Sequence, residues 1–80
     1  MIDAKKAKLI YDKENESRGD EAVRVQDAGD FFVIIPKIKS CLGIVIVSKE
    51  GKISRVNHPS KELMTKIFNA KTIYEVGIRK

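Results

Sequence analysis

The chain has one cysteine, one histidine and no tryptophan among its 80 residues, with two prolines and five scattered glycines. A lone cysteine excludes an intramolecular disulfide. A zinc site needs about four ligands, which one cysteine and one histidine cannot supply. The scattered glycines exclude a Walker A or dinucleotide-binding loop. No apolar stretch reaches the ~20 residues of a membrane helix, and the first residues lack the apolar segment of a signal peptide. We therefore expect a cytoplasmic protein with no cofactor, no metal site and no membrane association.

The length and the charge distribution of the chain indicate its domain organisation and its type of partner. Eighty residues predict a single domain spanning residues 1–80, and a composition of 34% charged and 42% hydrophobic residues is typical of a globular chain. The net charge of +5 arises in the second half, where eight Lys and Arg residues face only Glu50, Glu62 and Glu75. A basic half of this kind favours an anionic partner, either nucleic acid or an acidic protein surface.

Most of the strong hydrophobic residues lie between residues 31 and 47, and their pattern predicts strands. The segments 31–35 and 42–47 read as buried strands, the second apolar on both faces and therefore interior to a sheet. Pro36 ends or bulges the first of them. Gly51 suits the positive-φ position of a tight turn into a strand over 52–57. Alternation over 21–27 and 71–78 predicts two more strands.

The remaining segments are predicted to be a helix, a loop and an N-terminal segment that fits either a strand or a helix. Ser60 is a plausible N-cap of an amphipathic helix that ends at Asn69. Residues 12–20 are polar and are predicted to form a mobile loop. Alternation over Ala7–Tyr11 predicts an edge strand, with a helix over 3–11 as the competing interpretation. The sum is an α+β fold: a mostly antiparallel sheet in the order β-β-β-β-α-β, with one amphipathic helix packed on one face.

The first functional hypothesis is a small non-enzymatic binding or regulatory protein that engages its anionic partner through the C-terminal half. If the hairpin and the helix share a face, five or six cations form one patch suited to phosphate binding. No recognition-helix motif or aromatic platform indicates that a base sequence is read. The candidate contact residues are Lys49, Lys52, Arg55, Lys61, Lys66, Lys71, Arg79 and Lys80.

A second hypothesis is a Cys–His amidase or deamidase. Cys41 begins one strand of the predicted hairpin and His58 follows the end of its partner, so an antiparallel pairing brings the two ends together. The Ser40-Cys41 pair and the downstream His58 resemble the bacterial chemoreceptor glutamine deamidases over about a quarter of the chain. That resemblance implies a nucleophilic Cys41 with His58 as its base. The threonine that completes the site in that family has no counterpart upstream of Cys41, where Ile34, Ile35 and Pro36 stand.

Two further interpretations concern the sheet. The segment from Gly43 to Asn57, followed by Leu63, is similar to the opening strands of PAS sensor domains, which implies a hairpin followed by a helix. The elements that build the ligand pocket of that family have no counterpart after Asn57. The third functional hypothesis is a structural module that forms a homodimer through exposed strand edges, at Ala7–Tyr11 or Thr72–Ile78.

Overall fold

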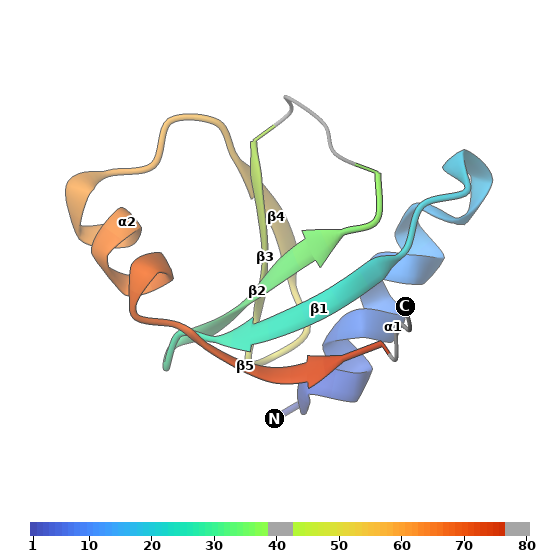
Figure 1. The fold of residues 1–80 in the computed structure, drawn as a ribbon, viewed down its shortest axis with the longest axis horizontal. Coiled ribbons are helices and arrows are strands. Elements are labelled where there is room, and N and C mark those ends of the chain that lie inside the picture. The colour runs from blue at the N-terminus through green and yellow to red at the C-terminus, as the bar shows by residue number, and fades with distance from the viewer. Residues whose placement is uncertain (39–42, 77–80) are drawn as a thin grey trace.

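The computed structural model describes residues 1–38 and 43–76 and contains one five-stranded antiparallel sheet and two α-helices (Figure 1). The strands lie side by side in the order β4-β3-β2-β1-β5. This confirms the α+β class, and the order β-β-β-β-α-β follows an additional N-terminal helix. The elements in chain order are α1 (Ala4–Glu14), the 3₁₀-helix η1 (Glu16–Arg18), β1 (Ala22–Asp27), β2 (Phe31–Pro36), β3 (Ile44–Ser48), β4 (Ile53–Val56), α2 (Lys61–Phe68) and β5 (Lys71–Glu75).

The first element is a helix, so the edge strand predicted over Ala7–Tyr11 is wrong. Asp3 caps the helix, because its side chain accepts a hydrogen bond from the main-chain N–H of Lys6 at 2.9 Å. Ala7 and Tyr11 are four residues apart, lie on the same side of the helix and are both buried against the sheet. Leu9, which alternation would place beside them, is 58% exposed. The helical period therefore describes this segment, and Ala7–Tyr11 cannot offer a strand edge for dimerisation.

Residues 12–20, predicted to form a mobile polar loop, are largely helical. They contain the last turn of α1 and all of η1, and Gly19 ends η1 in the left-handed conformation with φ of 72°. Two of their polar side chains, Asn15 and Asp20, are buried, at 2% and 4% exposed. The segment therefore forms a hydrogen-bonded helical corner with two buried polar side chains. Its mobility stays a prediction.

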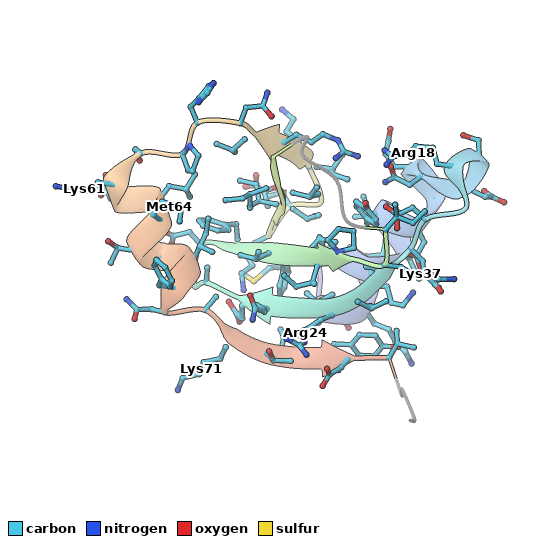
Figure 2. The ribbon with its side chains drawn as sticks, turned by 45° about the horizontal axis from the view of Figure 1, so that its top comes forward. Arg18, Arg24, Lys37, Lys61, Met64 and Lys71 are labelled. Carbon is cyan, nitrogen blue, oxygen red and sulfur yellow. The ribbon has the colours of Figure 1, made fainter. Side chains whose placement is uncertain are left out.

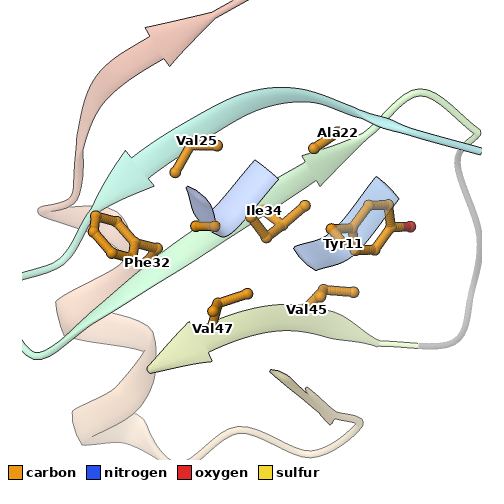
Figure 3. Packing of buried hydrophobic residues seen from close by; sticks show 8 residues of the cluster. Tyr11, Ala22, Val25, Phe32, Ile34, Val45 and Val47 are labelled. Atoms are coloured by element: carbon orange, nitrogen blue, oxygen red, sulfur yellow. The ribbon is translucent and has the colours of Figure 1, made fainter. Parts of the chain in front are cut away.

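The hydrophobic core lies between α1 and one face of the sheet (Figure 3). Alternate residues of the strands supply it, because successive side chains of a strand point to opposite faces. Ile53 from β4 and Tyr74 from β5 also pack against it, although these strands form opposite edges of the sheet. Both edge strands therefore contribute side chains to the core that α1 covers. The buried cluster is Ala7, Tyr11, Ala22, Val25, Phe32, Ile34, Val45 and Val47.

The two helices have different relations to the sheet. Helix α1 packs against β1, β2 and β5, so it is the helix that covers a face. Helix α2 begins and ends as predicted: the Ser60 hydroxyl accepts from the N–H of Leu63 at 3.1 Å, and Asn69 is the C-cap. None of the eight residues of α2 is buried, and Phe68 is 81% exposed. Figure 1 shows α2 standing beside the sheet, away from α1.

Candidate anion-binding site

The predicted basic residues fall at two ends of the sheet. We name these the turn end, around the β1–β2 turn at residues 27–30, and the corner end, around η1 and residues 18–22. Figure 2 shows Lys61 and Lys71 on the side of the turn end, and Arg18 and Lys37 on the side of the corner end. Arg55 belongs to the corner end, because its side chain reaches Asn15. Arg79 and Lys80 lie outside the described residues.

At the turn end, two of the predicted cations are already paired with carboxylates. The Nζ of Lys49 lies 3.0 Å from Asp27 and 4.2 Å from the centre of the Phe32 ring. The Nζ of Lys66 lies 2.7 Å from Asp30, which ties α2 to the β1–β2 turn. An anionic ligand at these lysines would have to displace an internal carboxylate.

The pKa directions at the turn end agree with this pairing. A hydrogen bond from the Gly29 N–H, followed by one from Lys49, lowers the pKa of Asp27. The hydrogen bond and charge of Lys66 lower the pKa of Asp30, and Asp30 in turn raises the pKa of Lys66. The Lys66–Asp30 pair is exposed to solvent and therefore contributes little to stability, whereas the Lys49–Asp27 pair is partly buried.

At the corner end, two guanidinium groups converge on one amide oxygen. Arg18 Nη1 and Arg55 Nη2 each donate to Asn15 Oδ1, both at 3.1 Å. The residues come from η1 and β4, and 37 positions separate them in sequence. Within residues 1–38 and 43–76, neither guanidinium has a carboxylate within 4.0 Å. Both therefore keep donors for an external acceptor, in the fork geometry that suits carboxylate and phosphate.

Asn15 is held in place by the end of α1. Its Nδ2 donates to the Tyr11 carbonyl at 2.9 Å, and its main-chain N–H donates to the same oxygen at 3.1 Å. The Asn15 carbonyl accepts from the N–H groups of Arg18 and Asp20, at 3.1 and 3.3 Å. These bonds orient Oδ1 toward the two guanidiniums, so the arginines are positioned before any ligand arrives.

A buried carboxylate fixes the corner behind Asn15. The Tyr11 hydroxyl donates to Asp20 Oδ2 at 2.5 Å, and Asp20 Oδ1 accepts from the N–H groups of Glu21 and Ile38 at 2.8 and 2.9 Å. Asp20 therefore joins α1 to the start of β1 and to the segment after β2. Its three hydrogen bonds all lie within the corner, so Asp20 stabilises the backbone beside the site.

Burial and hydrogen bonding shift the pKa of Asp20 in opposite directions, whereas burial and the hydrogen bond to Asp20 both raise the pKa of Tyr11. Desolvation alone would raise the pKa of Asp20, but hydrogen bonds from Tyr11, Ile38 and Glu21 and the charge of Arg18 bring it below its ordinary value. Burial, with the Asp20 carboxylate beside it, raises the pKa of Tyr11, an effect that Arg55 partly offsets. At neutral pH the pair is thus a carboxylate and a neutral phenol.

A hollow of about 490 Å³ opens beside the two arginines. Its apolar part is Ile53, which also packs against the core, and its charges are two arginines against one glutamate. An excess of positive charge in an open recess with a partly apolar floor suits an anionic group carried on a larger ligand. The lining residues are Glu14, Asn15, Arg18, Ile53, Ser54 and Arg55.

The predicted Cys41–His58 site is untested, because Cys41 lies outside the described residues. His58 is exposed. Gly43 adjoins the end of β4, since a Cβ added to it would lie 2.5 Å from Asn57 Oδ1. Among the described residues, no group of three or more His, Cys, Asp and Glu side chains is placed to hold a metal ion.

Sequence reasoning identified Arg55 and missed its partners. Arg18 and Asn15 lie in the segment that we expected to be a loop, and nothing local in the sequence links them to β4. The one usable signal is the run of cap and turn residues from Asn15 to Gly19, which is typical of a helix that ends in an ordered corner.

Comparisons with protein-family models, with curated proteins and with solved structures find no match for this chain. In the described part of the chain, neither helix combines the length and the apolar character that spanning a bilayer requires. The candidate site therefore stands on its geometry alone.

Proposed function

We propose that this protein is a small binding module that receives an anionic group of its partner, a carboxylate or a phosphate, in the hollow at the corner end. Arg18 and Arg55 are the residues that bind the anion, and Asn15 positions them. The observation that supports this is the convergence of two guanidiniums on one buried amide oxygen, with no carboxylate paired to either among the described residues. The partner is an acidic protein or a nucleic acid.

The turn end is the weaker candidate for the same role. Lys49 and Lys66 are engaged by Asp27 and Asp30, so a ligand gains little beyond what it displaces. At the corner end, in contrast, the present acceptor is a neutral amide. Each guanidinium keeps further N–H donors, so an anion can add hydrogen bonds between opposite charges while Asn15 holds the two arginines in place.

The experiment is a titration of the ¹⁵N-labelled protein with inorganic phosphate at low ionic strength, followed by the backbone amide resonances. We expect saturable shifts at residues 15–18 and 53–56. Arg18→Met and Arg55→Met should each weaken binding roughly tenfold, equivalent to about 1.4 kcal/mol. The matched control is Arg24→Met, because Arg24 is an arginine of the same sheet whose guanidinium is engaged by Glu75 at 2.7 Å.

Equal losses in all three variants would mean that phosphate responds only to net charge and would overturn the assignment. A parallel titration with single-stranded and duplex DNA and RNA at two salt concentrations separates the partner classes. A nucleic-acid partner predicts affinity that falls steeply with salt, whereas no binding at low salt leaves a protein partner.

A further inference from the structure

β4 is an outer strand of the sheet, so one of its edges is open. It pairs only with β3 in the described sheet, in a regular antiparallel register from Ile44↔Val56 to Val47↔Ile53. The N–H of Ser48 donates to the carbonyl of Lys52 at 2.8 Å, which fixes the alternation of this ladder. Main-chain groups of Ser54 and Val56 therefore face β3, and those of Ile53 and Arg55 face the open edge.

The hollow reaches this same edge. Three consecutive residues of β4, from Ile53 to Arg55, line it, although successive side chains point to opposite faces of the sheet. An added strand would therefore meet the free main-chain groups of Ile53 and Arg55, and its alternate side chains would enter the hollow toward Arg18.

Charge decides what kind of strand fits. The hollow carries two guanidiniums and one carboxylate, Glu14, so its net positive charge matches an acidic side chain. Ile53 offers an apolar contact to the next side chain on the same face of an added strand. The sugar–phosphate backbone of a nucleic acid lacks the alternating amide and carbonyl groups that the open edge of β4 would pair with.

We propose that the partner is an extended acidic peptide segment that adds to the sheet as a strand beside β4 and places a carboxylate between Arg18 and Arg55. Main-chain hydrogen bonds give such a complex its affinity, and the side-chain pocket gives it selectivity. This inference rests on the proposed function, because it identifies the partner of the same site.

The test uses as the probe a capped hexapeptide of serine with one glutamate and one valine two positions apart, so that both side chains lie on the same face of the added strand, titrated into the full ¹⁵N-labelled chain. We expect saturable shifts at residues 53–56 and at Arg18, with none at β5. The matched glutamine–valine peptide should bind at least tenfold more weakly. The same acidic peptide N-methylated at alternate residues, on the edge that faces β4, should lose binding to a similar degree because it cannot form the ladder.

The outcomes separate this inference from the proposed function. If phosphate binds at Arg18 and Arg55 but the acidic peptide does not, or if the N-methylated peptide binds equally well, the strand model is wrong and the anion site remains. Binding of a single-stranded oligonucleotide in place of the peptide also overturns it. If neither phosphate nor the peptide binds, both proposals fail. Sedimentation of the free protein excludes self-association as the source of shifts along β4.

Discussion

Positive side chains gather at both ends of the sheet, but their acceptors differ. At the turn end, Lys49 and Lys66 meet the carboxylates of Asp27, at the end of β1, and Asp30, in the exposed turn that follows. At the corner end, the carboxylate of Asp20 is buried and takes its hydrogen bonds from Tyr11 and the main chain. The arginines there converge on a neutral amide oxygen, and neither is paired with a carboxylate among the described residues.

The difference shows that a carboxylate near cations need not neutralise them. Asp20 accepts hydrogen bonds from the main chain close to Arg18, whereas Asp30 pairs directly with the ammonium group of Lys66. Net charge counted along the sequence treats the two aspartates alike, but only the arrangement of donors around each decides which cations stay available for a partner.

The largest expected effect is a loss of stability on removal of the buried aspartate. Asp20→Ala removes an acceptor for Tyr11 and for two main-chain N–H groups, and leaves these donors partly buried without a partner. We expect a loss of about 3 kcal/mol in the free energy of unfolding, from unsatisfied donors that cost roughly 1–3 kcal/mol each. Urea denaturation measures it, with the slope of the transition checked for a change in the unfolded state.

Asp30→Ala is the matched control at the turn end. Asp30 is solvent-exposed and pairs with a lysine that is itself 42% exposed, so its removal should leave the urea midpoint unchanged within error. Similar losses from the two substitutions would remove the distinction between a structural and a neutralising carboxylate.

The second prediction concerns pH. The folded-state pKa of Asp20 lies below its unfolded value, so its carboxylate contributes stability fully above the unfolded pKa of about 3.9. That contribution is lost as pH falls through the folded pKa. The stability difference between the native protein and Asp20→Asn should therefore be constant from about pH 5 to pH 7 and shrink at lower pH. A stability difference that grows as the pH falls would contradict a lowered pKa of Asp20 in the folded state.

The third prediction concerns a substitution that places a neutralising carboxylate beside the two arginines of the corner end. Asn15→Asp puts a carboxylate where Arg18 and Arg55 converge, so phosphate affinity should fall roughly tenfold. The variant also loses the Nδ2 donation to Tyr11, at a cost of about 1 kcal/mol. Calorimetric titration measures the affinity, and the circular dichroism spectrum confirms that the variant is folded. Unchanged affinity would exclude the shared amide oxygen as part of the site.

The fourth prediction has the smallest expected effect and concerns the removal of the neutralising carboxylates from the turn end. Asp27→Asn with Asp30→Asn frees Lys49 and Lys66 and should let the turn end bind phosphate weakly. We expect a second, two- to threefold weaker site with shifts at residues 27–31 and 66–71 in the same titration. If the native protein already shows these shifts, internal pairing does not keep the turn end closed to anions.

The sheet was predictable from the sequence because its signals are local. The apolar runs at Phe31–Ile35 and Ile44–Val47, the glycine turn at Gly51 and the cap at Ser60 each depend on neighbouring residues. Each gave the right element, within one or two residues at its ends.

The N-terminal helix was missed because two periods coexist in a short segment. Ala7, Leu9 and Tyr11 alternate as in a strand, whereas Ala7 and Tyr11 are also spaced as in a helix. The Asp3 cap and the Lys8–Asp12 ion pair were the local signals that favour the helix. Burial of Ala7 and Tyr11 and exposure of Leu9 settle the choice.

The candidate site was only partly predictable, because its residues meet through topology. Arg55 was recognised as a cation, but its contact with Asn15 joins positions 40 residues apart. It exists because the fold brings β4 close to the C-terminal end of α1. No periodicity or motif encodes that approach, and composition alone cannot distinguish Arg55 from the paired Lys49 and Lys66.

In the proposed site, Arg18 and Arg55 together bind the anion. The most direct measurement follows the side-chain Nε–H resonances of the arginines during a phosphate titration of the native protein. If both guanidiniums bind the same anion, the Arg18 and Arg55 signals shift along one binding curve while the Arg24 signal stays in place. Equal shifts of Arg24, or separate curves for Arg18 and Arg55, would contradict it.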